Sequence, residues 1–219
     1  MTIIVKIGGS LTRGAAPRRL LARLAAERGL VVVPGGGALA DQVRAVQPQW
    51  ALSDAAAHRM ALLAMEQMAH AMLDIEPRLL PARTPSELSA AAAQGAALWF
   101  PAAMTLGRAG IPESWDVTSD SLALWLAAEL DAERLVLVKA PGAPLPSPLP
   151  SPSGDRAADI ARWSATGLVD AAFATMAVRF AGDILPLPAD DGDRLADALR
   201  TRAGAAAMTE ETKEGSRLS

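Results

Sequence analysis

Two lysines and two glycine-rich loops are the residues of this chain whose types and spacing could do chemistry. Lys6 comes just before the loop Gly8-Gly9-Ser10, and Lys139 ends an apolar run. A second loop, Gly35-Gly36-Gly37, follows another apolar run. Glycine lets backbone amides approach an anion closely, and the N-terminus of a following helix adds a favourable dipole. Because a buried ammonium needs an anionic partner, two lysines beside two such loops suit a polyphosphate.

The elements that must position these residues form a strand, helix and strand pattern at the start of the chain. Short β-branched runs closed by glycine or proline predict buried parallel strands, and apolar residues at helical spacing predict the helices between them. We predict strands at 3–7, 30–33, 97–100, 134–138 and 184–187. We predict helices at 17–25, 38–46, 54–73, 85–93, 119–130, 155–181 and 190–203, the one from Thr118 or Ser119 to Leu130 being amphipathic. This order indicates an α/β fold, a three-layer αβα sandwich with a mostly parallel central sheet. Both glycine loops then lie at the carboxyl edge of the sheet, where ligands bind in such folds.

The chain has 219 residues, and we predict a single domain over residues 1–204. Six of the 16 prolines fall in residues 141–152, so we expect a flexible loop at 141–153. Residues 205–219 have no periodic apolar pattern and are expected to form a disordered tail.

Composition excludes several classes of function. The formal net charge of −3 gives no basic surface for nucleic acid, so no nucleic-acid partner is expected. With no cysteine and two histidines, a resident metal site is not expected either. No apolar run reaches membrane-spanning length and the N-terminus does not look like a secretory signal, so we expect no membrane association and a cytoplasmic location.

Four ordered motifs resemble the amino acid kinase family: KIGGS at 6–10, PGGG at 34–37 followed by Asp41, TSD at 118–120 before a helix, and LVLVK at 135–139. The resemblance spans roughly residues 3–187. Members of that family bind ATP with Mg²⁺ over the edge of a mostly parallel sheet. They transfer the γ-phosphoryl group to a carboxylate, carbamate or phosphate acceptor.

The resemblance implies a role for each motif. Lys6 and Lys139 would neutralise the transferring phosphoryl group, and Asp120 would orient them. ATP phosphates would lie on Gly8, Gly9 and Ser10. The acceptor would lie on Gly35, Gly36, Gly37 and Ser119. A homo-oligomer is also implied.

Two segments, 53–65 and 115–127, resemble a branch of the family that phosphorylates phosphate monoesters, including the aminomethylfuran methyl phosphate of methanofuran biosynthesis. By that resemblance His58 is a candidate hydrogen-bond donor to the acceptor phosphate. The acceptor's ammonium group would need a carboxylate, and Asp116, Asp54 or Asp170 could supply it. Trp115 is the tryptophan we would place near an aromatic acceptor. Arg44 and Arg59 could add charge, although solvation at the surface is the simpler interpretation.

The chain departs from the general family pattern twice. Lys139 is followed by Ala-Pro-Gly where many members have Asp-Gly, and residues 166–172 lack the lysine of a T-G-G-M-x-x-K motif. These departures motivate an alternative, a nucleotide- or metabolite-binding protein without turnover. A further alternative is a kinase with another acceptor: a carboxylate, isopentenyl phosphate or a nucleoside monophosphate.

Overall fold

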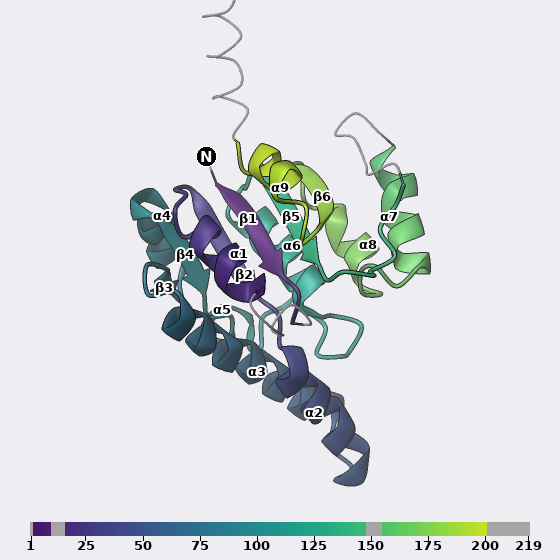
Figure 1. Ribbon diagram of the computed structural model, residues 1–219. Coiled ribbons are helices and arrows are strands. Elements are labelled where there is room, and N and C mark those ends of the chain that lie inside the picture. Colours follow the sequence, from purple (N-terminus) through teal and green to yellow (C-terminus); the bar gives the residue numbers. More distant parts are fainter. Residues whose placement is uncertain (1, 10–15, 148–154, 201–219) are drawn as a thin grey trace, which may run out of the picture.

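The computed structural model describes residues 2–9, 16–147 and 155–200. Figure 1 shows a central sheet with helices on both sides. The strands are β1 (Ile3–Ile7), β2 (Leu30–Pro34), β3 (Leu80–Ala82), β4 (Ala96–Trp99), β5 (Arg134–Lys139) and β6 (Asp183–Pro188). The helices are α1 (Ala16–Leu24), α2 (Gly37–Gln49), α3 (Asp54–Ile75), α4 (Pro85–Gln94), α5 (Ala102–Thr105), α6 (Ser119–Glu129), α7 (Arg156–Ala165), α8 (Phe173–Ala177) and α9 (Gly192–Leu199).

The six strands form one sheet in the order β3-β4-β2-β1-β5-β6, and every pairing is parallel. The expected α/β sandwich is therefore confirmed. β1 lies between β2 and β5, with Lys6 in register with Val33 and Leu137. Parallel alignment brings the carboxyl ends of these three strands, and the loops that follow them, to one edge of the sheet.

Alternation along the strands builds two cores, one on each face of the sheet. Ile4 and Leu135 face a core made with α4, α6, α7 and α8. Ile3 and Val136 face the opposite core, made with α1, α9 and the second half of α3. Because β1, β2 and β5 are buried on both faces, apolar residues fill successive positions rather than every second position, apart from Arg134 and the two lysines.

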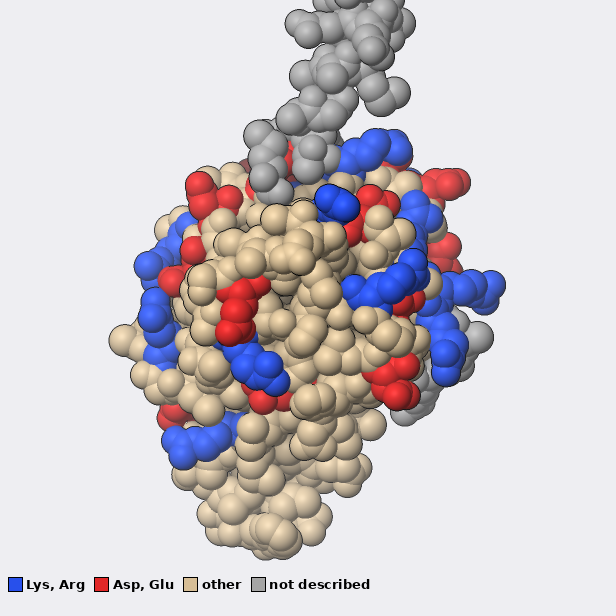
Figure 2. All heavy atoms as spheres, turned by 90° about the vertical axis from the view of Figure 1, so that its left-hand side faces the viewer, with Lys and Arg blue, Asp and Glu red and all other residues tan. Residues whose placement is uncertain are grey.

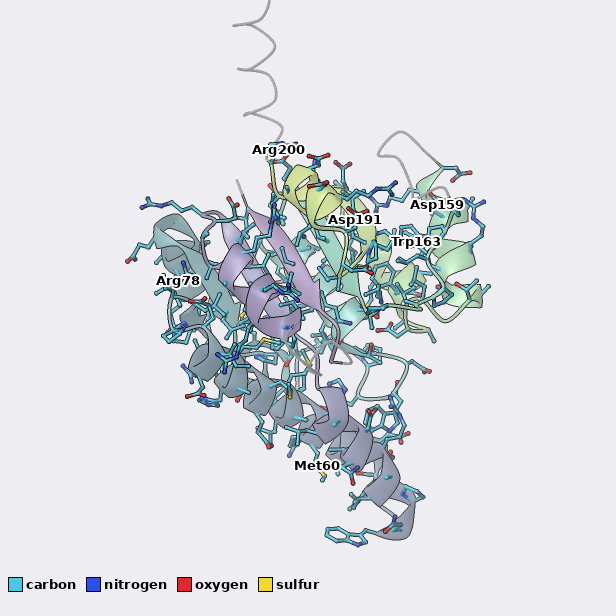
Figure 3. The ribbon with its side chains drawn as sticks, in the orientation of Figure 1. Met60, Arg78, Asp159, Trp163, Asp191 and Arg200 are labelled. Atoms are coloured by element: carbon cyan, nitrogen blue, oxygen red, sulfur yellow. The ribbon has the colours of Figure 1, made fainter. Side chains whose placement is uncertain are left out.

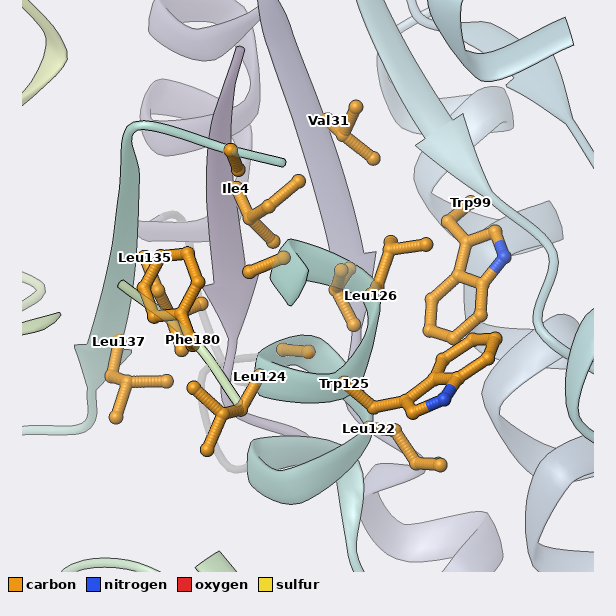
Figure 4. Packing of buried hydrophobic residues seen from close by; sticks show 14 of the residues in the cluster. Ile4, Val31, Trp99, Leu122, Leu124, Trp125, Leu126, Leu135, Leu137 and Phe180 are labelled. Carbon is orange, nitrogen blue, oxygen red and sulfur yellow. The ribbon is translucent and has the colours of Figure 1, made fainter. Parts of the chain in front are cut away.

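Helix α6 differs from the expected amphipathic helix, because every residue from Asp120 to Ala127 is buried. Figure 4 shows its side chains in the middle of the first core. Trp125 stacks on Trp99 of β4 with ring centroids 6.2 Å apart, while Leu124 lies on the side of Leu137 and Phe180. A helix that is covered on all sides has no polar face, so the prediction of an amphipathic helix with one exposed face was wrong.

Other expected elements hold with changed ends. Ser53 and Thr84 cap α3 and α4 as their sequences predict, each accepting from a backbone N–H three residues on. The expected helical region 155–181 is two helices, α7 and α8, joined by a loop, and α9 ends at Leu199. β3 and α5 were not predicted, because segments of three and four residues are too short to show a periodic spacing of apolar residues. Residues 148–153 of the proline-rich loop and the tail 205–219 lie outside the described residues.

Candidate active site

Two buried lysines and one aspartate meet at the carboxyl edge of the sheet. Lys6 Nζ lies 3.0 Å from Asp120 Oδ1, and Lys139 Nζ lies 2.9 Å from Asp120 Oδ2. Lys6 and Lys139 stand on neighbouring strands, β1 and β5, and Asp120 is in the first turn of α6. Lys139 Nζ also donates to the Leu168 carbonyl. The sequence-predicted trio is thus one cluster, with Asp120 bridging the two ammonium groups.

The cluster carries one more positive than negative charge. Burial alone would raise the pKa of Asp120, but the ammonium groups of Lys6 and Lys139 outweigh burial and hold that pKa below its ordinary value. Burial lowers the pKa of Lys139, and the charge of Lys6 lowers it further, while Asp120 and Asp170 act in the opposite direction. A dehydrated site with a net positive charge is stabilised by an anion.

The two glycine loops touch each other. A Cβ on Gly9 would lie 2.2 Å from the Gly37 Cα, and one on Gly35 would lie 2.6 Å from the Gly9 nitrogen. Gly37 also has φ +55°, a left-handed conformation that disfavours side chains. Glycine at these positions is therefore required by loop packing, independently of any ligand.

A cavity of about 390 Å³ opens above the two lysines, and we call it the lysine cavity. It is lined by Lys6, Gly8, Gly9, Asp120, Lys139, the segment from Ala140 to Pro144, Gly167 and Leu168. The backbone N–H of Gly8 donates to Val138 O at 3.2 Å, so this amide already has a partner within the protein. Ser10, the third residue expected in this loop, lies outside the described residues.

A second cavity, also of about 390 Å³, lies on the other side of Gly9, and we call it the histidine cavity. Its lining includes the sequence-predicted residues Gly36, Gly37, His58 and Ser119, together with Trp115, Arg44 and Asp41. Gly9 lines both cavities. Ser119 and Asp120, adjacent at the start of α6, line one cavity each.

His58 is 4 % exposed, and its Nε2 has no hydrogen-bond partner. Burial lowers the pKa of His58, while the nearby Glu113 and a backbone hydrogen bond with Ser114 oppose that shift. Since Nε2 has no partner, the bond with Ser114 belongs to Nδ1. A buried ring nitrogen without a protein partner, on a residue that lines a cavity, is a candidate contact for a ligand or a water.

Trp115 and Arg44 form one wall of the histidine cavity. The Arg44 guanidinium lies 4.2 Å from the Trp115 ring centroid, and Trp115 Nε1 donates to Gln47 Oε1 at 2.5 Å. Asp41, one helical turn before Arg44 on α2, lies 3.4 Å from its guanidinium. This side of the cavity is thus aromatic and charged, and it contains both Trp115 and Arg44, two residues that the sequence suggested for an acceptor site.

Some predicted residues lie elsewhere. Gly35 does not line either cavity, and its N–H donates to Ile7 O at 2.9 Å, so it acts in loop packing. Asp116 and Asp54 do not line the histidine cavity, and their carboxylates contact Ser114 and Gln47. Asp170 is bonded to α6 instead. Among the described residues, the carboxylate that does line this cavity is Asp41, one helical turn from Gly37.

Within residues 2–9, 16–147 and 155–200, no group of three or more histidine, aspartate or glutamate side chains could hold a metal ion. In the same part of the chain no helix has the length and apolar character needed to cross a membrane.

An all-parallel sheet between helices, with glycine loops at the carboxyl ends of its strands, is an open α/β fold of the kind that binds ligands at that edge. The sequence profile of the amino acid kinase family matches residues 1–140, well over half of the chain. The chain belongs to that family.

One kinase is similar to this chain in sequence. The chain is 30% identical over 142 residues to the [5-(aminomethyl)furan-3-yl]methyl phosphate kinase of Methanocaldococcus jannaschii. The match covers 61% of this chain and 63% of that kinase, so the chain spans less than two thirds of its relative's length.

Solved structures share the fold. Uridylate kinase from Archaeoglobus fulgidus superposes with a TM-score of 0.66 at 16% identity, covering 91% of this chain and 95% of that one. UMP kinase from Ureaplasma parvum gives a TM-score of 0.63 at 13% identity, covering 91% and 94%. At these identities the likeness shows a common fold.

Proposed function

We propose that this protein is an ATP-dependent kinase that transfers the γ-phosphoryl group to a phosphate monoester. The observation that carries this is the pair of cavities that meet at Gly9, with two buried lysines in one and His58 in the other. In this proposal the lysine cavity takes the phosphates of ATP, and the histidine cavity takes the acceptor. The bond from the γ-phosphorus to the β-phosphate oxygen breaks and one to the acceptor's phosphate oxygen forms, giving ADP and a diphosphate.

The small number of lysines and their placement support the proposal. Lysine and arginine total 21, of which only three are lysines: Lys6, Lys139 and Lys213. A chain that otherwise uses arginine places both of its described lysines on one carboxylate. A lysine ammonium is a compact point charge, whereas a guanidinium is a broad planar fork. The compact charge suits a narrow strand end where phosphoryl oxygens must approach closely.

The chemistry that we propose is positional and electrostatic. Phosphoryl transfer needs neutralised charge and aligned reactants more than a covalent nucleophile, and cysteine is absent from the chain. Lys6 and Lys139 would neutralise charge on the transferring group, and Asp120 would hold the two ammonium groups at fixed positions. Mg²⁺ bound to the ATP phosphates would supply further charge neutralisation.

His58 would bind the acceptor phosphate. Because Nδ1 bonds to the Ser114 backbone, the Nε2 of a neutral ring is an acceptor. A phosphate dianion offers only acceptors, so binding it would require a proton on Nε2. We therefore propose that His58 takes up a proton as the acceptor phosphate binds, which reverses the effect of burial on its pKa.

The specific acceptor that we propose is the aminomethylfuran methyl phosphate named in the relative from M. jannaschii. Asp41 would pair with the ammonium group and Trp115 would cover the furan ring, since both line the histidine cavity. Asp41→Asn should raise the KM for this acceptor about tenfold while leaving the KM for isopentenyl phosphate, which has no ammonium, unchanged. An equal change in both KM values would contradict this assignment.

The same proposal includes a cytoplasmic location and a homo-oligomer. Figure 2 shows that the lowest part of the face it presents, where α2 and α3 project, is almost free of charged side chains. Large apolar side chains exposed on α2, on α3 and between them include Leu39, Trp50 and Leu63. Such a face fits contact with a second copy.

The test is titration calorimetry of MgATP into the protein. It is combined with an ADP-release assay on three acceptors: the aminomethylfuran methyl phosphate, isopentenyl phosphate and UMP. ATP binding and ADP release that depends on an acceptor are expected. Binding without ADP from any acceptor would instead support the alternative of a binding protein without turnover. Absence of both, with a cooperative unfolding transition, would refute the kinase proposal.

A further inference from the structure

Asp170 makes four hydrogen bonds to a segment about 50 residues earlier in the chain. Its Oδ2 accepts from Thr118 N at 2.9 Å, from Thr118 Oγ1 at 2.7 Å and from Ser121 N at 3.1 Å. Its Oδ1 accepts from Ser121 Oγ. These four donors belong to the N-cap and third residue of α6, and Asp120 lies between them.

The contact does the work of an N-cap supplied from elsewhere in the chain. Thr118 occupies the N-cap position of α6, but its own side chain makes no capping hydrogen bond. Its hydroxyl donates to Asp170 instead, and the Asp170 carboxylate satisfies the backbone N–H that a cap would normally satisfy. The turn that carries Asp120 is therefore set from outside the helix.

The loop that carries Asp170 also reaches Lys139. Leu168, two residues earlier, accepts from Lys139 Nζ through its carbonyl, and Gly167 and Leu168 line the lysine cavity. Beyond Asp170, Ala172 N donates to Asp116 O at 2.9 Å. One loop between α7 and α8 thus holds both the start of α6 and the second lysine.

We infer that Asp170 is a positioning residue of the transfer site, holding the first turn of α6 so that Asp120 meets both lysines. This inference rests on the proposed function. It goes further because Asp170 lies in the segment where the sequence lacks the lysine of many family members. A carboxylate there stabilises the two lysines through a helix rather than contacting the nucleotide.

Asp170→Asn tests the inference, since an amide keeps the size but removes the charge and half of the acceptor capacity. We expect kcat to fall at least tenfold with the KM for ATP changed less than threefold. The charged groups that act on Lys139 are Lys6, Asp120 and Asp170. Loss of the Asp170 charge should lower the Lys139 pKa further, so the alkaline limb of the kcat profile should move to lower pH.

Lysine NMR gives a readout that needs no turnover. Protein labelled with ¹³C at lysine Cε should show three signals, one for each lysine of the chain. Titration in the wild type and in Asp170→Asn reports the Lys139 pKa directly. If the wild type has no kinase activity but the Lys139 titration also moves in Ser121→Ala, a variant that keeps the Asp170 charge, the proposed function fails while the positioning inference stands.

The matched control is Asp191→Asn. Asp191, labelled beside α9 in Figure 3, also caps a helix through its carboxylate, accepting from Arg194 N at 3.1 Å, and it lines neither cavity. The Asp191→Asn substitution should leave kcat and the Lys139 titration unchanged. An Asp170→Asn protein with wild-type lysine titration, and with no greater loss of kcat than the control, would overturn the inference.

A second variant covers the case in which Asp170→Asn does not fold. Ser121→Ala removes one of the four hydrogen bonds and leaves the carboxylate in place. It should lower kcat at least threefold without changing the KM for ATP. An unchanged kcat in this variant would overturn the inference equally.

Discussion

Replacing Lys139 with methionine should separate activity from stability. Methionine is similar in length and has no charge, so the substitution takes the cluster of Lys6, Lys139 and Asp120 from a net charge of +1 to zero. Two unit charges 4 Å apart interact by about 4 kcal/mol at an effective dielectric constant of about 20. Loss of one preorganised contact to developing charge costs about 3–4 kcal/mol, or about 10²- to 10³-fold in kcat.

Stability should respond differently, because Asp120 keeps its ion pair with Lys6 at 3.0 Å. Burial disfavours the charged form of Lys139, as the direction of its pKa shift shows. The variant therefore loses the bond to Leu168 O but also loses the cost of dehydrating an ammonium, and we expect a stability change of no more than about 1–2 kcal/mol. Asp120→Asn is the contrast. It leaves two buried ammonium groups without a counter-charge and should cost about 3–5 kcal/mol.

The assay is ADP release under single turnover, with urea unfolding of the same preparations. Lys213→Met makes the same chemical change outside the described residues and controls for the loss of one charge. A Lys139→Met protein with turnover within tenfold of the wild type would refute the role of this charge. So would a loss of stability as large as that of Asp120→Asn, because unfolding would then explain the lost turnover.

Three further predictions follow from the same geometry. His58→Ala should raise the KM for a phosphate acceptor about 10- to 100-fold with little effect on the KM for ATP, since a hydrogen bond to a charged group contributes about 1.5–3 kcal/mol. Steady-state kinetics with both substrates varied is the measurement. An equal rise in the two KM values would mean that His58 is merely structural. Gly9→Ala should destabilise the protein by about 1–3 kcal/mol and lower turnover, because its Cβ would lie 2.2 Å from Gly37, whereas Gly95→Ala, with its nearest atom 3.6 Å away, should be tolerated in urea unfolding. MgATP binding should take up a proton in the alkaline range below pH 10.5, because the phosphates raise the lowered pKa of Lys139. The affinity for MgATP should therefore fall as pH rises through the Lys139 pKa of the free protein. Calorimetry in buffers of different ionisation heat measures the proton uptake, and a value of zero would contradict this prediction.

The strands around the site could be predicted from the sequence because their burial leaves a direct mark. β1, β2 and β5 are covered on both faces, so each contains at least three consecutive apolar residues, which Lys6 follows in β1 and Lys139 follows in β5. Parallel order then requires Lys6 and Lys139 to reach the same edge of the sheet. The meeting of the two lysines could therefore be expected before any coordinates, and the histidine at the start of α3 lines a cavity at the same edge.

The contacts of the aspartates could not be predicted in this way. Asp170 was one of three carboxylates considered for an acceptor's ammonium, but it bonds to Thr118 and Ser121 across about 50 residues of sequence. No local pattern marks a helix capped from another loop. Asp41 had a weak signal, since it follows Gly37 by one helical turn and so faces the same side of α2.

The first turn of α6 lies between the two cavities that the proposed reaction assigns to ATP and to the acceptor. Successive residues of a helix point about 100° apart, so Ser119 and Asp120 face different cavities although they are adjacent. Any tilt of that turn would move both cavities relative to each other, and a misplacement of about 1 Å can cost about 10²-fold in rate. Burial of α6 on all sides and the four bonds to Asp170 both resist such a tilt. In the proposed reaction, the first turn of this core helix, rather than a flexible loop, would therefore set the distance between the phosphates of ATP and of the acceptor.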